Sequence, residues 1–285
     1  TGHTMNYVKV YCSVEDLRNE IRRVRSMPLE AAVAETKKLA QEGYREIVIN
    51  GIEISSWGWE WKDGSRLSQL LLAVCQAAPG VRIRLGSLEP RTIDETFCKS
   101  HSACKNLCPQ FHLSLQSGSD TVLKRMNRKY DTARYLESVR LLHEYFPNCA
   151  VTTDLIVGFP GETEQEFYDS LAFMQTCNLA AVHVFPYSRR KGTPAASMPE
   201  QIEKSEKERR AALAGQTAAA LHTAFLTAQI GTEHDVLFEQ TEKGYFTGHT
   251  MNYVKVYCSV EDLRNEIRRV RVTALLEDGV LAELI

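Results

Sequence analysis

Short apolar segments alternate with amphipathic segments through the middle of this 285-residue chain, and this alternation limits the possible folds more than any other feature. Five segments have the length of buried strands, namely residues 46–50, 81–85, 111–115, 151–157 and 181–185. Helices are predicted between them, because Pro28 opens one amphipathic segment (28–41) and acidic residues open another at Glu162. Strands that alternate with helices run parallel, which predicts an α/β fold, either a partial barrel or a doubly wound sheet.

Five strands are one fewer than a half-open six-stranded barrel needs, and the missing strand would be the first. The segment NYVKV (6–10) has the right alternation and precedes the first helix, so it is a candidate for that position. A long helical segment from Pro199 to about Gln229, closed by Gly231, would then lead to a second domain. In folds of this kind the chemistry gathers at the C-terminal ends of the strands.

Residues 1–25 recur without a difference at 247–271. The C-terminal copy lies between alternating segments that predict a small all-β barrel. The N-terminal copy has no such neighbours, so we interpret it as the result of a duplication or of an error in sequence assembly, with a genuine swapped strand as the alternative. The chain begins with Thr1 and not Met, and we expect the true start to be missing.

Composition excludes several classes of protein. The longest apolar runs, such as residues 70–74, are far shorter than the roughly 18 residues of a membrane span. A net charge of −2 and a pI near 6.4 argue against a protein that coats nucleic acid, so any RNA contact is expected to be local. Eight cysteines in a long helical chain indicate reduced thiols and a cytoplasmic location.

Polar, glycine-containing turns follow four of the predicted strands: NGIEISSWG (50–58), GSLEP (86–90), QSGSD (116–120) and GFPGET (158–163). Glycine lets a ligand approach the backbone closely, and the amides at the start of a helix can hold a carboxylate or phosphate. We therefore predict a small, zwitterionic, nucleotide-like ligand at this rim of the barrel. Asp154 points from a strand toward the rim, where it would either bind the ligand or satisfy neighbouring hydrogen-bond donors.

Four runs in order make the prediction specific: IRLGSLEP (83–90), FHLSLQSGSDTVLKRMNRKY (111–130), TTDLIVGFPGETEQEF (152–167) and VHVFPYSRRKGTPAA (182–196). They resemble the radical S-adenosylmethionine (SAM) methylthiotransferases, most closely the branch that acts on threonylcarbamoyladenosine in tRNA. The resemblance extends from about Arg25 to the C-terminus. It implies a partial (β/α)6 TIM-like barrel over residues 26–222 and a small RNA-binding TRAM barrel over residues 223–285, with residues 1–25 a duplicated piece of the latter.

The resemblance also implies an activity, cofactors and a partner. Such enzymes use SAM and 4Fe-4S clusters to add a methylthio group to N6-threonylcarbamoyladenosine beside the anticodon, so the partner would be the tRNA anticodon stem-loop. By the same resemblance, the SAM contacts would be Asn50 and Gly51 at the methionine end, Gln116 and Ser117 near the ribose or carboxylate, and Gly158 and Tyr187 near the adenine, with Asp154 at the rim. No catalytic residue is assigned.

The cysteine pattern departs from this family. Its catalytic cluster is held by three thiolates spaced CxxxCxxC, and this spacing occurs nowhere in the chain. Cys12 stands alone in the region where the motif is expected, and Cys104 and Cys108 have Phe111 at the place of a third ligand. No metal ligand is therefore assigned, the domain carrying the family's second cluster is expected to be missing, and the chain as given is expected to be inactive.

The C-terminal barrel supplies the predicted RNA contacts, which are His249, Tyr253, Lys255, Arg264, Arg268 and Arg269. Their local positive charge and stacking side chains favour RNA binding, and a merely solvated charged face is the alternative. Two other functions stay open. One is a non-catalytic RNA-binding remnant, and the other is a methylthiotransferase acting on isopentenyl-adenosine tRNA or on a ribosomal protein.

Overall fold

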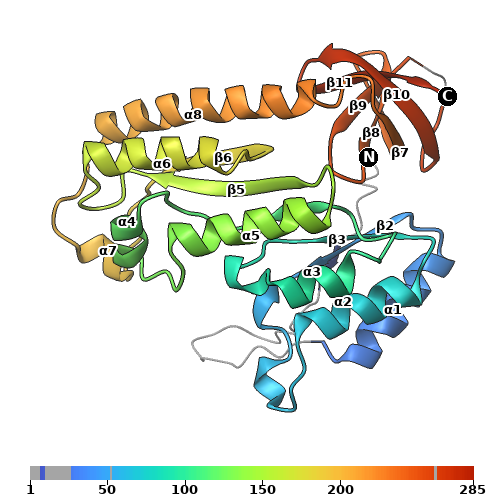
Figure 1. The fold of residues 1–285 in the computed structure, drawn as a ribbon, viewed down its shortest axis with the longest axis horizontal. Helices are drawn as coiled ribbons and strands as arrows, with labels where there is room; N and C mark the ends of the chain where they lie inside the picture. Colours follow the sequence, from blue (N-terminus) through green and yellow to red (C-terminus); the bar gives the residue numbers. More distant parts are fainter. Residues whose placement is uncertain (1–6, 10–26, 52, 260–261) are drawn as a thin grey trace.

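The computed structural model describes residues 7–9, 27–51, 53–259 and 262–285 (Figure 1). Six parallel strands form its first part: β1 Tyr7–Lys9, β2 Glu46–Asn50, β3 Arg82–Leu85, β4 Gln110–His112, β5 Ala150–Val157 and β6 Ala181–Pro186. They lie in chain order in two three-stranded sheets, β1-β2-β3 and β4-β5-β6. Isolated bridges from Ile83 to Leu107 and from Leu88 to Leu113 join the two sheets. The predicted partial parallel barrel is therefore confirmed.

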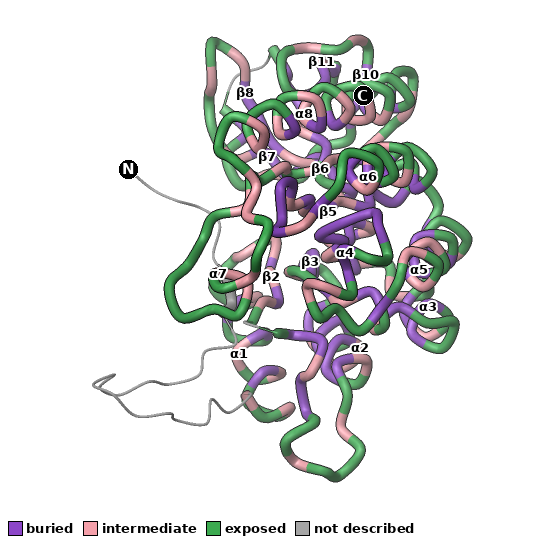
Figure 2. The backbone as a smooth tube through the Cα atoms, turned by 90° about the vertical axis from the view of Figure 1, so that its left-hand side faces the viewer, coloured by how far each residue is buried: buried purple, intermediate pink, exposed green. Residues whose placement is uncertain are grey.

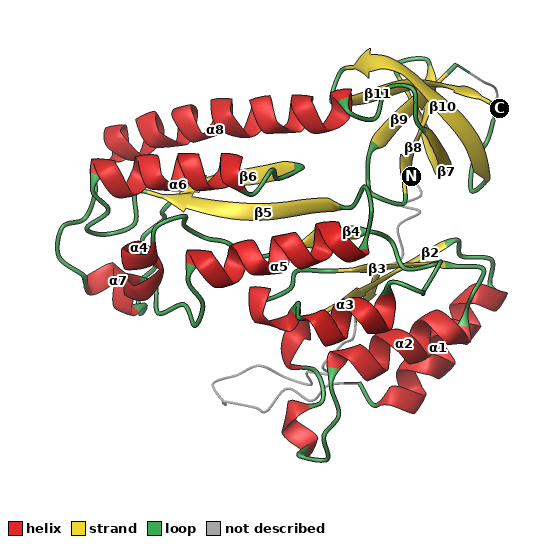
Figure 3. Cartoon of the chain, in the orientation of Figure 1, coloured by secondary structure: helices red, strands yellow, loops and turns green. Residues whose placement is uncertain are grey.

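The helices are α1 Leu29–Gln41, α2 Leu67–Ala77, α3 Glu95–His101, α4 Asp120–Arg125, α5 Thr132–Tyr145, α6 Glu164–Thr176, α7 Pro194–Ser197 and α8 Lys204–Thr227. Figure 3 places α1 to α3 beside β2 and β3, and α6 and α8 along β5 and β6. Buried residues concentrate along the strands and on the helix faces turned toward them (Figure 2). Within the described ranges, no helix is both long and apolar enough to cross a bilayer.

Strand β4 ends at His112, three residues before the predicted end, because a side chain interrupts its hydrogen-bond ladder. The hydroxyl of Thr153 on β5 donates to the carbonyl of Leu113 and accepts from the amide of Leu115, 2.9 Å away. The helix predicted from Glu162 begins two residues later. There the Thr163 hydroxyl accepts from the amide of Glu166 at 3.2 Å and so caps α6.

The C-terminal part is a closed five-stranded barrel at the end of α8 (Figure 1). Its strands are β7 Glu233–Glu242, β8 Tyr245–Thr250, β9 Lys255–Cys258, β10 Ile267–Leu276 and β11 Gly279–Leu284. Val236, Phe238, Val256, Val270 and Val280 are fully buried and fill its centre. The predicted small all-β barrel is confirmed, and it is consistent with a TRAM domain.

The two copies of the repeated segment fold differently. Tyr7–Lys9 form β1 and pair in parallel with β2, so that Val8 lies opposite Ile49. The corresponding Tyr253 lies in a turn with a left-handed φ of 65°, and β9 begins only at Lys255. The prediction that the N-terminal copy supplies the missing first strand is thus confirmed for Tyr7–Lys9. Cys12 and the rest of that copy lie outside the described residues.

Two buried arginines on β3 join the half-barrel to the small barrel. Arg82 donates to the carbonyls of His249 at 3.0 Å and Asp235 at 2.7 Å. Arg84 donates to the carbonyl of Met251 at 3.0 Å and forms a bidentate ion pair with Glu46 at 2.6 and 2.9 Å. Both guanidinium groups therefore satisfy backbone acceptors of the small barrel, which fixes its position against β2 and β3.

Candidate functional site

A cavity of about 510 Å³ lies beyond the C-terminal ends of β5 and β6. Its lining residues are Gln116, Asp154, Ile156, Phe185, Pro186, Tyr187, Ser188, Arg190, Thr193 and Ala195. Three of the residues predicted to bind the ligand, Gln116, Asp154 and Tyr187, thus meet in one cavity. Parallel strands bring their C-terminal ends to one rim, which is where ligands bind in such folds.

Gln116 holds an unusual backbone conformation at this rim. Its φ is 69°, which residues other than glycine rarely adopt. Its amide donates to the carbonyl of Asp154 and its carbonyl accepts from the amide of Ile156, both at 2.9 Å. These two bonds tie the turn to β5 and hold the side chain, which is only 8% exposed, against the cavity. An outlier held in this way is typical of ligand-binding turns.

Asp154 brings a negative charge to the same cavity. The Nε2 atom of His112 on β4 lies 3.4 Å from its Oδ2 atom, and Nδ1 of the same ring lies 3.1 Å from the Thr152 hydroxyl. The hydrogen bond with His112 holds the pKa of Asp154 below its usual value, although partial burial opposes this effect. The carboxylate is therefore ionised near neutral pH and suits a ligand ammonium group or ribose hydroxyls.

Tyr187 forms part of the cavity wall just after β6. Its amide donates to the Val157 carbonyl at 2.8 Å, and its ring contacts Phe159 edge-on with a centroid distance of 5.3 Å. The Lys207 ammonium lies 5.9 Å from the ring centroid. The Tyr187 hydroxyl is buried and has no hydrogen-bond partner among the described residues. A buried hydroxyl without a partner is typical of a site where a ligand or an ordered water supplies the missing hydrogen bond.

Gly158 shapes the rim without lining the cavity. Its φ is 72°, and its amide donates to Oε2 of Glu162 at 2.6 Å. A Cβ atom at this position would lie 2.2 Å from Cγ of Lys207, so α8 leaves no room for a side chain. Glu162 is in turn held by Arg210 at 2.7 Å, a pair that is almost fully buried. The GFPGET turn is therefore anchored to α8.

The other predicted SAM contacts lie outside this cavity. Asn50 ends β2 and its Oδ1 atom accepts from the amide of Gly51 at 2.9 Å. A Cβ atom on Gly86 would lie 2.3 Å from that oxygen, so any other residue there would displace the Asn50 side chain. Ser117 is fully buried with its hydroxyl 3.3 Å from that of Ser170. The ligand roles of Asn50, Gly51, Ser117 and Gly158 stay predictions.

Sequence reasoning missed seven residues of the cavity wall, and the three most relevant to ligand binding are Phe185, Arg190 and Thr193. All three lie in the run VHVFPYSRRKGTPAA (182–196), whose only signal at these positions is its resemblance to the methylthiotransferases. Phe185 belongs to a strand and therefore reads as a core residue, yet it is 51% exposed. Its exposure depends on the open side of the half-barrel, which no local pattern reports.

The described cysteines do not form a cluster site. No group of three or more His, Cys, Asp or Glu side chains in the described ranges could hold a metal ion. Cys108 is buried with its sulfur 3.9 Å from Glu46, and burial raises the pKa of its thiol to about 12. Burial also raises the pKa of Cys104. Because no three of the described cysteines converge, they do not supply the three thiolates that hold a 4Fe-4S cluster.

The predicted RNA contacts of the small barrel are largely paired with acidic groups. Lys255 lies 2.9 Å from Glu242, Arg268 lies 2.7 Å from Glu266, and Arg269 lies 3.4 Å from Asp235. Arg264 is exposed. The ring of His249 stacks on Tyr253 at 4.6 Å, and the Arg84 guanidinium lies over Tyr253 at the same distance. RNA binding by these six residues stays a prediction.

Known proteins resemble this chain in sequence and in fold. The sequence model of the radical SAM superfamily matches residues 10–174. Threonylcarbamoyladenosine tRNA methylthiotransferase MtaB of Thermotoga maritima is 35% identical over 98% of this chain and 65% of its own length. The tRNA-2-methylthio-N(6)-dimethylallyladenosine synthase of Symbiobacterium thermophilum is 33% identical over 92% of this chain and 57% of its own.

Among solved structures, methylornithine synthase has a TM-score of 0.50 with 18% identity, covering 76% of this chain and 61% of that one. This similarity concerns the fold alone. The chain spans less than two thirds of the length of the two curated relatives named above.

Proposed function

This chain belongs to the radical SAM superfamily, and from that premise we propose that it is the SAM-binding and RNA-binding part of a tRNA methylthiotransferase. The proposed target is N6-threonylcarbamoyladenosine in the anticodon stem-loop, and a cytoplasmic location follows from a tRNA substrate. The observation that carries the proposal is the cavity in which Gln116, Asp154 and Tyr187 converge. The 35% identity to the enzyme of Thermotoga maritima supports it.

The cavity suits a nucleoside with a charged tail. The Tyr187 hydroxyl offers a buried hydrogen bond, and the Asp154 carboxylate can accept from ribose hydroxyls or an ammonium group. The side-chain amide of Gln116 can both donate and accept hydrogen bonds at the same wall of the cavity. When bound, SAM would supply the methyl group and the radical chemistry of the superfamily. The residues described here would bind and orient it and keep water from it.

A second candidate function is RNA binding without catalysis, and one observation favours it. The 285 residues contain no CxxxCxxC spacing, and the described cysteines do not fit a cluster. We therefore derive no catalytic step through a cluster. The choice of threonylcarbamoyladenosine over isopentenyl-adenosine rests on the motif runs, because the curated relatives of the two kinds are similarly identical to this chain, at 35% and 33%.

Nucleoside analysis tests the proposal. We expect tRNA from a strain lacking the gene to contain N6-threonylcarbamoyladenosine without its methylthio group, as measured by mass spectrometry of digested tRNA. The gene encoding these 285 residues is then returned to the strain. Only a catalytic chain restores the methylthio group, so this step separates a methylthiotransferase from a non-catalytic RNA-binding protein. Deletion that leaves the methylthio content of tRNA unchanged would contradict the proposed substrate.

A further inference from the structure

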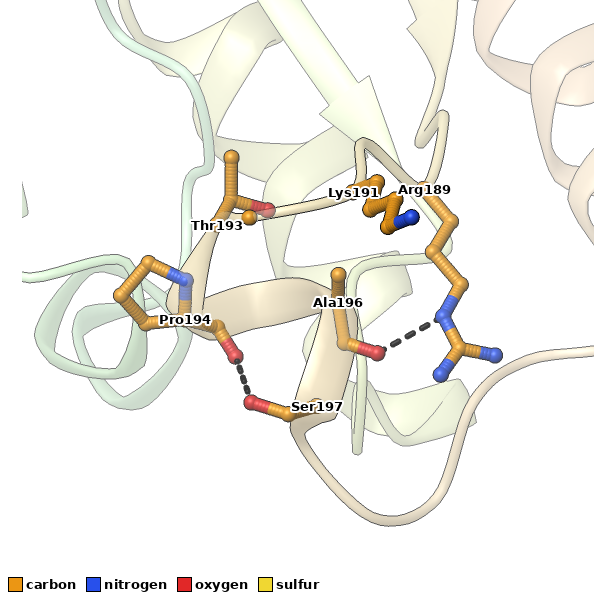
Figure 4. Close-up of a pocket in the computed structure, with 7 residues that line it drawn as sticks. Arg189, Lys191, Thr193, Pro194, Ala196 and Ser197 are labelled. Carbon is orange, nitrogen blue, oxygen red and sulfur yellow. Dashed lines mark hydrogen bonds between the residues drawn. The ribbon is translucent and has the colours of Figure 1, made fainter.

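Three consecutive cations, Arg189, Arg190 and Lys191, lie in the exposed loop between β6 and α7. A second cavity of about 760 Å³ opens beside them (Figure 4), lined by Arg189, Lys191, Gly192, Thr193, Pro194, Ala196 and Ser197. Thr193 lines both this cavity and the one that contains Asp154 and Tyr187. A ligand in the basic cavity would therefore lie next to the proposed SAM site.

The charge of this loop is not neutralised by the protein. In the described part of the chain, none of its three cations forms an ion pair, whereas Lys255, Arg268 and Arg269 of the small barrel all do. Arg189 is nevertheless held in place, because its Nε atom donates to the Ala196 carbonyl at 2.7 Å (Figure 4). Its terminal guanidinium nitrogens stay available for a bidentate contact with a phosphate.

An exposed aromatic ring lies close by along the chain. Phe185 is 51% exposed near the end of β6 and lines the cavity that shares Thr193 with the basic one. An apolar ring left open to solvent beside cations is the combination with which proteins hold unpaired nucleotides, because bases stack on the ring while cations contact the backbone.

We propose that this loop binds the backbone of unpaired RNA, with Arg189 and Lys191 contacting phosphates and Phe185 stacking on a base. The identity of the RNA as the anticodon loop rests on the proposed function, but the binding itself does not. The main phosphate contacts would then belong to the half-barrel, beside the SAM site, and not to the small barrel. This arrangement would bring a neighbouring base up to the SAM molecule proposed for the cavity of Gln116, Asp154 and Tyr187.

The test measures the affinity of the full chain for a synthetic, unmodified anticodon stem-loop RNA over a range of salt concentrations. The variant Arg189→Gln/Lys191→Gln should flatten the logarithmic salt dependence by about 1.4, since each contact with single-stranded RNA contributes roughly 0.7. A matched control, Lys37→Gln/Lys38→Gln, removes two exposed cations from α1 and should leave the slope unchanged. Phe185→Leu should weaken binding on the order of tenfold without changing the slope.

Two outcomes overturn the inference. One is a slope that is unaffected by Arg189→Gln/Lys191→Gln but flattened by Lys255→Gln/Arg268→Gln/Arg269→Gln, and the other is the absence of RNA binding at low salt. Thermal unfolding of each variant confirms that it is folded, as expected for substitutions at exposed positions. Because the assay requires neither SAM nor catalysis, its result is independent of the nucleoside analysis that tests the proposed function.

Discussion

Removing the Tyr187 hydroxyl tests whether the cavity binds SAM. This hydroxyl is buried without a partner among the described residues, so Tyr187→Phe should leave the free energy of unfolding unchanged or raise it slightly. If a SAM atom completes this hydrogen bond, the same substitution should weaken SAM binding by about 1 kcal/mol, or roughly fivefold. Isothermal titration with SAM and thermal unfolding measure the two quantities.

Tyr135→Phe is the matched control for this prediction. Tyr135 is fully buried and its hydroxyl donates to the Leu113 carbonyl at 3.3 Å. Its loss should cost about 1 kcal/mol of stability and leave SAM affinity unchanged. Equal SAM affinities of the parent chain and Tyr187→Phe would show that the hydroxyl does not contact the ligand.

Single residues show where sequence reasoning succeeds and where it stops. Asp154 was predicted because it points from a strand toward the rim, whereas Gln116 and Tyr187 were predicted from the family resemblance of their motif runs. The neighbouring Ser117 was predicted for the same reason, yet the structure buries it against Ser170. The backbone conformation decides which of two adjacent polar side chains faces a cavity. Gln116 has a φ of 69°, and the residue types alone do not predict this angle.

At the scale of elements, the GFPGET turn and α8 are joined by one buried ion pair. The side chains of Glu162 and Arg210 are 1% and 6% exposed and lie 2.7 Å apart. Arg210→Ala would leave a buried carboxylate without its partner, so we expect it to lower the free energy of unfolding by about 3–5 kcal/mol. Chemical denaturation of the purified chain measures this change.

Arg209 on the same helix supplies the control for Arg210. It pairs with Glu164 and Glu206, but its side chain is 42% exposed. Arg209→Ala should therefore cost less than about 1 kcal/mol, because solvent screens such pairs. Similar losses for the two variants would mean that the turn is not anchored through Glu162.

Element boundaries were predictable to within a few residues where hydrophobic periodicity is strong. Strand β2 has the predicted limits, and α8 begins only at Lys204, five residues after the predicted Pro199. The repeated segment sets the limit of such reasoning, since Tyr7 lies in a strand and the identical Tyr253 in a left-handed turn. The two copies have the same intrinsic preference for a strand, so the segments that pack against them decide their conformation. These segments are β2 for the first copy and the strands of the small barrel for the second.

At the scale of the whole molecule, the contact between the two domains depends on the side chains of β3. Charged side chains that alternate with apolar ones, as in the sequence RIRL of this strand, ordinarily lie on the solvent face of a sheet. The structure instead leaves Arg82 and Arg84 only 4% exposed, each donating to carbonyls of the small barrel. Which domain covers a polar strand face is a tertiary property, and sequence patterns do not predict it.

Arg84→Ala should therefore loosen the two domains as well as destabilise the chain. The substitution removes the donor to the Met251 carbonyl and leaves Glu46, whose side chain is 12% exposed, with only the more distant Arg82 at 4.0 Å. We expect a loss of about 3–5 kcal/mol in the free energy of unfolding and a larger radius of gyration by small-angle X-ray scattering.

The double variant Glu46→Gln/Arg84→Met separates these two effects. It removes the paired charges of Glu46 and Arg84 together, and Arg82 keeps its two carbonyl acceptors, so much of the stability should return, because a neutral pair of similar volume carries no desolvation penalty. Methionine cannot donate to the Thr250 and Met251 carbonyls, so the expanded radius of gyration should persist. A compact double variant would show that other contacts, such as the hydrogen bond from Asn252 to the Asn148 carbonyl at 3.0 Å, are enough to hold the small barrel in place.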